Sequence, residues 1–268
     1  MGRIGKKAAA AVPELEARLN DEHLFVRYHS VQALGLIGDK AAVPALIAKL
    51  KDRDIDVRAG AAYALGRIGE KEAVPALIAR LKDRDSGVTS SAAYALGLIG
   101  DKEALPALVA RLEDGDHKNI SSAVQALGHM GKKMPAVVVP FLRARLEDDD
   151  HKNISSAVQA LGLIGDKAAE AVPALITRLE DVSRDVRSSA AEALGRIGEK
   201  ASAAVPALIA RLNDSDVRSR AAEALGLIGE KAATAVVPAL VEMLKFKFYG
   251  REVQIPVRSA LKRLQRFS

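Results

Sequence analysis

Apolar residues recur along the chain with helical spacing, in short segments separated by brief polar turns. In the segment 43–50 the apolar positions fall at i, i+3, i+4 and i+7, and Pro44 lies in the first turn, where a missing N–H costs little. After a turn opened by Asp52, the segment 57–69 carries a second apolar stripe and ends at Gly69, as a left-handed cap would. The pattern predicts a pair of helices joined by a short turn.

The same two phrases recur along nearly the whole chain, 31–34 residues apart. Ala-Leu-Gly-x-Ile-Gly or a near copy places its first glycine at Gly35, Gly66, Gly97, Gly128, Gly162, Gly195 and Gly226. Because a lone helical hairpin cannot cover its apolar stripe, neighbouring pairs must stack. The sequence therefore predicts an all-α solenoid of about eight two-helix repeats, forming one domain over residues 1–268 with a divergent segment at 245–268.

This pattern resembles the HEAT-like repeats of the phycobilisome-lyase type. The resemblance lies in the Asp-Val-Arg triplets at 56–58, 185–187 and 216–218, each followed by Ala-Leu-Gly-x-Ile-Gly. It implies a right-handed superhelix in which the Val-Arg helices line the concave face and the Pro-containing helices the convex face. Residues 2–5 match the tail of a repeat, so we expect the array to start just after a missing helix.

The resemblance also implies that each Val-Arg arginine binds the Asp of the preceding turn. Thr89, Ile120 and Ile154 stand where that arginine is expected. We therefore expect Asp83, Asp114 and Asp148 to lose this partner, and the layers that contain them to be weak.

Composition excludes several kinds of chemistry. The chain has no Cys, which removes disulfides, thiolate zinc sites and cysteine nucleophiles and fits a reducing, cytoplasmic compartment. No apolar run approaches the ~18 residues of a membrane span. None of the five His is followed by Glu, so the iron-binding pattern of HEAT-type hydroxylases is absent, and no nucleophile, phosphate-loop or dinucleotide motif appears. We expect no catalytic residues, no metal and no cofactor.

The exposed positions of the Val-Arg helices change from repeat to repeat while the apolar stripe stays constant. A binding face has this character, and aromatic residues and Arg are typical interface anchors. The alternative is that exposed sites merely drift. The predicted concave binding residues are Phe25, Tyr28, His29, Tyr63, Tyr94, His117, Lys118, Gln125, His151, Lys152, Gln159 and Arg196.

The segment from His117 to Gly128 is repeated identically from His151 to Gly162. It is either a tandem recognition patch or a recent duplication of a drifted unit. A metal shared by His117 and His151 is disfavoured, because equivalent atoms on adjacent layers lie ~10 Å apart. A column of cations five residues after the prolines, such as Arg80 and Arg211, is better explained by the helix dipole and local Asp partners than by an acidic ligand.

The net charge of +6 is concentrated in residues 245–268, which hold seven basic groups and one acid, while the rest of the chain is balanced. The basic residues are Lys245, Lys247, Arg251, Arg258, Lys262, Arg263 and Arg266. With four aromatic residues beside them, they form either a cap on the last layer or a patch for an acidic partner.

We interpret the chain as a non-catalytic scaffold that binds another protein on its concave face. A bilin lyase subunit or lyase-associated factor is the alternative, and only the family resemblance implies it. Nucleic-acid binding is disfavoured by the neutral body of the chain and the absence of Trp. A designed repeat scaffold is a further alternative, although the uneven spacings favour a natural origin.

Overall fold

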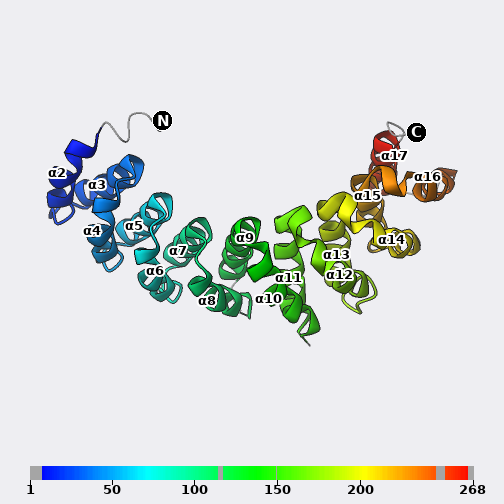
Figure 1. Cartoon of the computed structure of the whole chain (residues 1–268), viewed down its shortest axis with the longest axis horizontal. Helices are drawn as coiled ribbons and strands as arrows, with labels where there is room; N and C mark the ends of the chain where they lie inside the picture. The colour runs from blue at the N-terminus through cyan, green and yellow to red at the C-terminus, as the bar shows by residue number, and fades with distance from the viewer. Residues whose placement is uncertain (1–7, 114–116, 149, 246–250, 265–268) are drawn as a thin grey trace. The chain divides into compact units, whose positions relative to one another are not determined.

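A computed structural model describes residues 8–113, 117–148, 150–245 and 251–264, and every regular element among them is a helix (Figure 1). Also outside the description are the side chains of residues 113, 117–119, 230–235, 243, 245 and 251–253. The α-helices are α2 (Val12–Arg18), α3 (Leu24–Ile37), α4 (Val43–Lys49), α5 (Ile55–Ile68), α6 (Val74–Arg80), α7 (Ser86–Ile99), α8 (Leu105–Ala110), α9 (His117–Lys133), α10 (Pro135–Ala144), α11 (His151–Ile164), α12 (Val172–Arg178), α13 (Arg184–Ile197), α14 (Val205–Arg211), α15 (Arg218–Ile228), α16 (Glu230–Lys245) and α17 (Arg251–Leu264).

The chain divides into two compact units, residues 1–130 and 131–268. Helices α2 to α9 belong to the first unit, with the last turn of α9 running past its end, and α10 to α17 belong to the second. Each even-numbered helix carries a proline, and each odd-numbered helix carries the Ala-Leu-Gly phrase or its divergent counterpart, so the described residues contain the two-helix repeat eight times. The divergent helix α17 also contains a proline, Pro256. The prediction of an all-α solenoid is confirmed, whereas the single-domain organisation stays a prediction.

Local sequence sets the limits of each helix. In α5 the Asp54 side chain accepts a hydrogen bond from the N–H of Asp56 at 2.9 Å, which caps the helix start. Gly69 ends the same helix with φ 84°, as predicted. Pro44 lies in the first turn of α4, after a short 3-10 segment at Lys40–Ala42. The sequence predicts the last helix near 257–267, whereas α17 begins at Arg251 and its described part ends at Leu264.

Glycines inside the odd-numbered helices let neighbouring helices approach closely. A Cβ atom added to Gly66 would lie 2.6 Å from Cα of Ala95 on α7, a distance that real Cβ atoms do not adopt. Gly35 faces Ala64 in the same way, and Gly195 faces Ala224 in the second unit. This contact brings the apolar stripes together over fully buried leucines such as Leu65. The position of Gly66 inside a helix, before the glycine that ends it, predicts a close approach between helices, and this prediction is confirmed.

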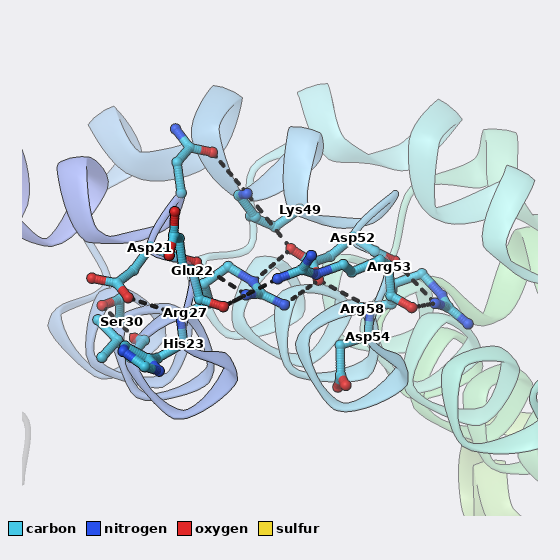
Figure 2. Close-up of polar contacts among 12 residues, drawn as sticks. Asp21, Glu22, His23, Arg27, Ser30, Lys49, Asp52, Arg53, Asp54 and Arg58 are labelled. Atoms are coloured by element: carbon cyan, nitrogen blue, oxygen red, sulfur yellow. Dashed lines mark hydrogen bonds and ion pairs between the residues drawn. The ribbon is translucent and has the colours of Figure 1, made fainter.

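Arginines tie successive repeats together through the interhelical turns (Figure 2). Arg27 donates from Nε and Nη2 to the two carboxylate oxygens of Asp52, each at 3.1 Å, and from Nη1 to the backbone oxygens of Asp21 and Glu22. Lys49 adds a second cation 3.6 Å from Asp52. The pair is nearly dry, with side chains 5% and 6% exposed. Each arginine therefore clamps its own turn to the next one.

The expected direction of this pairing was wrong. Arg58 donates to Asp83 of the following turn at 3.2 Å, and Arg187 likewise donates to Asp214 at 2.9 Å. From the preceding turn, only backbone oxygens accept from these guanidinium groups. The carboxylate of that turn already has other partners, which are Arg27 for Asp52 and both His151 and Arg178 for Asp181. Asp83 consequently has a partner.

Asp148, which was also expected to lack a partner, has partners in the structure. Asp148 is contacted by Arg145 and by Asn153. Asp114 lies outside the described residues.

The cations that follow the prolines are used locally. Lys49, Arg80, Arg145 and Arg178 each lie 3.1–3.6 Å from the Asp three residues later. The interpretation of this column as local pairing near helix ends is supported for these four residues.

Repeats without the bridging arginine are expected to open more readily. Thr89 on α7 and Ile154 on α11 cannot supply a bidentate guanidinium, so their turns are held to the next repeat by fewer charge-assisted bonds. We expect amide hydrogens of α7 to exchange faster than those of α5, and those of α11 faster than those of α13. Hydrogen-exchange mass spectrometry measures both comparisons within a single unit. Equal or better protection of α7 and α11 would contradict the arginine account.

Acid is expected to loosen the repeats that these carboxylates hold. Burial raises the pKa of Asp83, but the N–H of Asp85 and the Arg58 guanidinium lower it by more, so its pKa lies below the ordinary value. The same balance lowers the pKa of Asp52 and Asp214. A carboxyl group with a lowered folded-state pKa stabilises the fold above its unfolded pKa of about 3.9 and loses that effect as pH falls through the folded value.

We therefore predict a free energy of unfolding that is flat above about pH 5 and falls below about pH 4. Urea titrations across this range measure it. Asp83→Asn should be less stable at neutral pH and show a smaller acid-dependent fall. If Asp83→Asn lost as much stability in acid as the parent, the acid dependence could not be attributed to the Asp83 carboxylate.

Candidate functional site

A groove lies between α3 and α5 on the exposed side of the odd-numbered helices of the first unit. Its volume is about 380 Å3. It is lined by Tyr28, Gln32, Gly35, Leu36, Asp56, Ala59, Gly60, Tyr63, Ala64, Arg67 and Ser91. Gly60 and its small neighbours leave the space open, while Tyr28, Leu36 and Tyr63 supply large side chains around it. We call this feature the tyrosine groove.

Aromatic rings continue from the groove towards α9. Tyr63 and Tyr94 are stacked, with ring centroids 5.8 Å apart and planes 7° apart, and they are 47% and 36% exposed. His129 meets Tyr94 edge-on at 5.9 Å. The repeat spacing brings these side chains together, because Tyr63 and Tyr94 occupy equivalent positions on adjacent helices. We call the surface formed by Tyr28, Tyr63 and Tyr94 the tyrosine face.

The N-terminal end of the tyrosine face is more polar. Gln32 donates from Nε2 to the Tyr28 hydroxyl at 2.7 Å, which fixes the position of that ring. His29 meets Tyr28 edge-on, with ring centroids 5.3 Å apart. Phe25, also on α3, is highly exposed but does not line the groove. The structure thus places Tyr28, Tyr63 and Tyr94 together and leaves Phe25 to one side.

The groove has charges of opposite sign at its two ends. Asp56 lies in the first turn of α5 and Arg67 in its last turn. Neither side chain makes an ion pair with another residue in the described part of the chain. Both positions complement the helix dipole, which is the purely structural explanation for these residue types.

The equivalent surface of the second unit has different chemistry. Glu192 stands where Tyr63 does in the first unit, and it pairs with Arg196 at 2.6 Å and with Arg220 at 4.0 Å. Arg220 also pairs with Glu223 at 3.4 Å. Gln159 donates to Ser155, and Lys152 is exposed. Apart from Lys152, these polar side chains bind one another, so this surface lacks the open aromatic character of the first unit.

His151 has a structural partner. Its Nδ1 lies 3.1 Å from the Asp181 carboxylate, whose side chain is 4% exposed. Asp181 is the turn Asp that an arginine at position 154 would have bound, so the imidazole stands in for a missing guanidinium. This contact supports a local structural role. The side chains of His117 and Lys118 lie outside the described residues, and Gln125 is exposed on α9.

Three of the predicted C-terminal basic side chains are described. Arg258, Lys262 and Arg263 are exposed on α17, while the structures of Lys247 and Arg266 and the side chains of Lys245 and Arg251 lie outside the description.

Lys262 stands where the other repeats place their packing glycine, since Gly226 faces Ala260 as Gly66 faces Ala95. A helix cannot approach Lys262 as closely as α7 approaches Gly66. This geometry favours the interpretation of α17 as a cap.

Sequence reasoning did not select Leu36, Asp56 and Arg67, which line the groove, or His129, which contacts Tyr94. These residues occupy exposed and variable positions of the odd-numbered helices, and the repeat spacing does not indicate which of their side chains meet. The missed signal was the glycine at position 60, since every other repeat carries a larger residue at the equivalent site.

No group of three or more His, Asp or Glu side chains placed to hold a metal ion occurs in the part of the chain that the structure describes. Within the same residues, none of the helices has the length and apolar character needed to cross a membrane.

Comparison with known proteins places the chain in a family. The model of HEAT repeats matches residues 43–128, 139–226 and 172–262, and the model of the PBS lyase HEAT-like repeat matches residues 26–52. The chain therefore belongs to the HEAT-repeat proteins, and the resemblance to the phycobilisome-lyase type of repeat is confirmed.

Solved structures of several proteins are similar to the chain. One is an engineered protein, with 26% identity over 98% of this chain and 81% of that chain and a TM-score of 0.47. The complex of CpcE and CpcF of phycocyanin lyase from Nostoc sp. shows 27% identity over 94% of each chain and a TM-score of 0.42. Human deoxyhypusine hydroxylase in complex with glycerol shows 25% identity over 98% of each chain and a TM-score of 0.43. No curated protein matches the chain.

Proposed function

We propose that this HEAT-repeat protein is a non-catalytic scaffold that binds a partner protein through the tyrosine face of its first unit. The observation that carries the proposal is the stacked, half-exposed pair of Tyr63 and Tyr94 beside an open groove. Large exposed aromatic side chains next to an unfilled concavity are typical binding anchors. The equivalent positions of the second unit support the choice, because Glu192 and Arg196 there bind each other.

Replacing both Tyr63 and Tyr94 with alanine should abolish most partner binding. Truncating an interface anchor costs about 1–4 kcal/mol, which corresponds to at least a fivefold loss of affinity for each residue that acts as an anchor. The fold should be little affected, because both rings are partly exposed. The measurement is quantitative affinity purification from cells of the source organism, with thermal unfolding as the check on folding.

Gln159→Ala is the matched control, since Gln159 occupies the position of Tyr63 in a repeat of the second unit. It should retain the partners that the double tyrosine variant loses. Identical partner sets for the parent and the double variant would overturn the proposal. A co-purifying bilin pigment would instead favour the alternative of a bilin lyase subunit, and co-purifying nucleic acid would favour a nucleic-acid-binding protein.

Charge reversal on α17 separates the two candidate surfaces. Arg258→Glu with Lys262→Glu should leave the affinity, association rate and salt dependence of partner binding close to those of the parent if the tyrosine face is the site. If α17 docks an acidic partner, the same variant should slow association and change its salt dependence, because charged rims act mainly on encounter. Surface plasmon resonance with a partner identified by the purification measures both quantities.

A further inference from the structure

The shape of the tyrosine groove selects an extended chain over a helix. The groove lies between the adjacent helices α3 and α5, and axes of packed helices are about 8–10 Å apart. A helix with its side chains is about 10–12 Å across and therefore rests above such a groove. An extended peptide is narrower, and the small side chains of Gly35, Ala59 and Gly60 give it room. The volume of about 380 Å3 is within the range of peptide and small-molecule sites.

The charges at the ends of the groove set a length. Asp56 and Arg67 are eleven residues apart on α5, about three turns on the same side, and hence about 16 Å apart along the axis. An extended chain rises about 3.3 Å per residue, so about five residues span this distance. Tyr63 and Tyr28 line the groove between the two ends, where apolar side chains or prolines would pack on their rings.

Comparison of α5 with α13 shows that free charges of opposite sign at the two ends of the helix are not a fixed feature of the repeat. Helix α13 also carries an acid and an arginine eleven residues apart, Asp185 and Arg196. There Glu192 neutralises Arg196 at 2.6 Å. In α5 the position of Glu192 is taken by Tyr63, which leaves the positive charge of Arg67 available. The groove therefore combines aromatic walls with an unneutralised charge of each sign.

We infer that the tyrosine groove binds an extended peptide segment with a basic residue over Asp56, an acidic residue about five positions away over Arg67, and apolar or proline residues between them. The inference rests on the proposed function and names its partner chemistry. Opposite charges at the two ends also fix the direction of the bound chain, because the reversed segment would place like charges together.

The test is selection from a library of random peptides displayed on phage, using the full chain as bait. Two variants accompany the parent. Gly60→Met fills the groove, because the atoms nearest to a Cβ at this position belong to Val31 and Tyr28, at 3.4 Å or more, and the longer side chain extends into the open space. Asp56→Lys with Arg67→Glu reverses the polarity and leaves the aromatic walls intact. Circular dichroism checks the folding of both, and the neutral pair Asp56→Asn with Arg67→Gln replaces the reversed pair if that variant does not fold.

The parent should enrich peptides with opposite charges about five residues apart around an apolar centre. The reversed variant should enrich the opposite order of charges, the neutral variant should lose the charge pattern, and Gly60→Met should enrich none of these peptides. An unchanged consensus in the reversed or neutral variant, together with a loss in Gly60→Met, would overturn the inference but keep the groove as the site. The same peptides from Gly60→Met as from the parent, or no enrichment by the parent, would overturn both the inference and the proposed function at this groove.

Discussion

Replacing Gly66 with alanine is expected to destabilise the first unit by about 1–3 kcal/mol or more, although alanine is the better helix former. The added Cβ would lie 2.6 Å from Cα and 2.7 Å from Cβ of Ala95. Both contacts are with helix α7 itself and not with the end of a flexible side chain, so α5 and α7 must move apart. The buried leucine layer beneath them, including Leu65, would then lose its close packing.

Gly60, in the same helix, provides the matched control with the opposite sign. A Cβ there has ordinary contacts, 3.4 Å from Val31 and 3.7 Å from Tyr28. Gly60→Ala should therefore raise the free energy of unfolding by about 0.5–1 kcal/mol, through the lower conformational entropy of the unfolded chain. Urea unfolding followed by circular dichroism measures both variants. If Gly66→Ala is as stable as Gly60→Ala, the close approach of α5 and α7 is wrong.

Replacing Arg27 with alanine is expected to cost about 3 kcal/mol, towards the lower limit for breaking a buried ion pair. The substitution leaves the Asp52 carboxylate, 6% exposed, without its bidentate partner, and removes the donor to the backbone oxygen of Asp21. The backbone oxygen of Glu22 loses the same donor but keeps a hydrogen bond from Arg53. Lys49, 3.6 Å from Asp52, retains part of the charge balance and keeps the loss from being larger. Chemical unfolding at neutral pH measures the difference.

Arg18→Ala is the control, because it removes an arginine whose ion pair is exposed. Arg18 pairs with Glu14 at 3.0 Å, but both side chains are exposed. Exposed pairs contribute at most about 1 kcal/mol, so this variant should be close to the parent. Similar losses for Arg18→Ala and Arg27→Ala would show that the clamp between turns contributes nothing beyond a surface ion pair.

The helical repeat followed from the sequence because its signals are local. Apolar spacing, Pro44 in a first turn and Gly69 as a cap act within a few residues, and the structure has each where it was expected. The direction of the Arg58–Asp83 pair was not predictable in the same way. That pair joins residues 25 positions apart, and only the stacking distance between repeats decides which carboxylate the guanidinium reaches.

The sequence predicted which side chains of the candidate site lie at equivalent positions on successive helices, but it did not predict the groove beside them. Equivalent positions on successive helices grouped Tyr63 with Tyr94, and the rings do stack. The same reasoning grouped His151 with them, whereas its imidazole contacts Asp181 in a place set by the absence of a neighbouring arginine. The groove itself depends on how Gly60 lies against Tyr28 and Val31 of α3, which is a property of two packed helices and not of one helix sequence.

Site-specific photocrosslinking tests the central claim most directly. A photoreactive phenylalanine analogue placed at position 63, and separately at the equivalent position 192, would be irradiated in cells of the source organism. Adducts would be identified by mass spectrometry. The account predicts a covalent partner-protein adduct from position 63, one that is absent when Gly60→Met fills the groove, and no such adduct from position 192. An adduct from position 192 alone, or none from position 63, would contradict the assignment of the tyrosine face as the binding site.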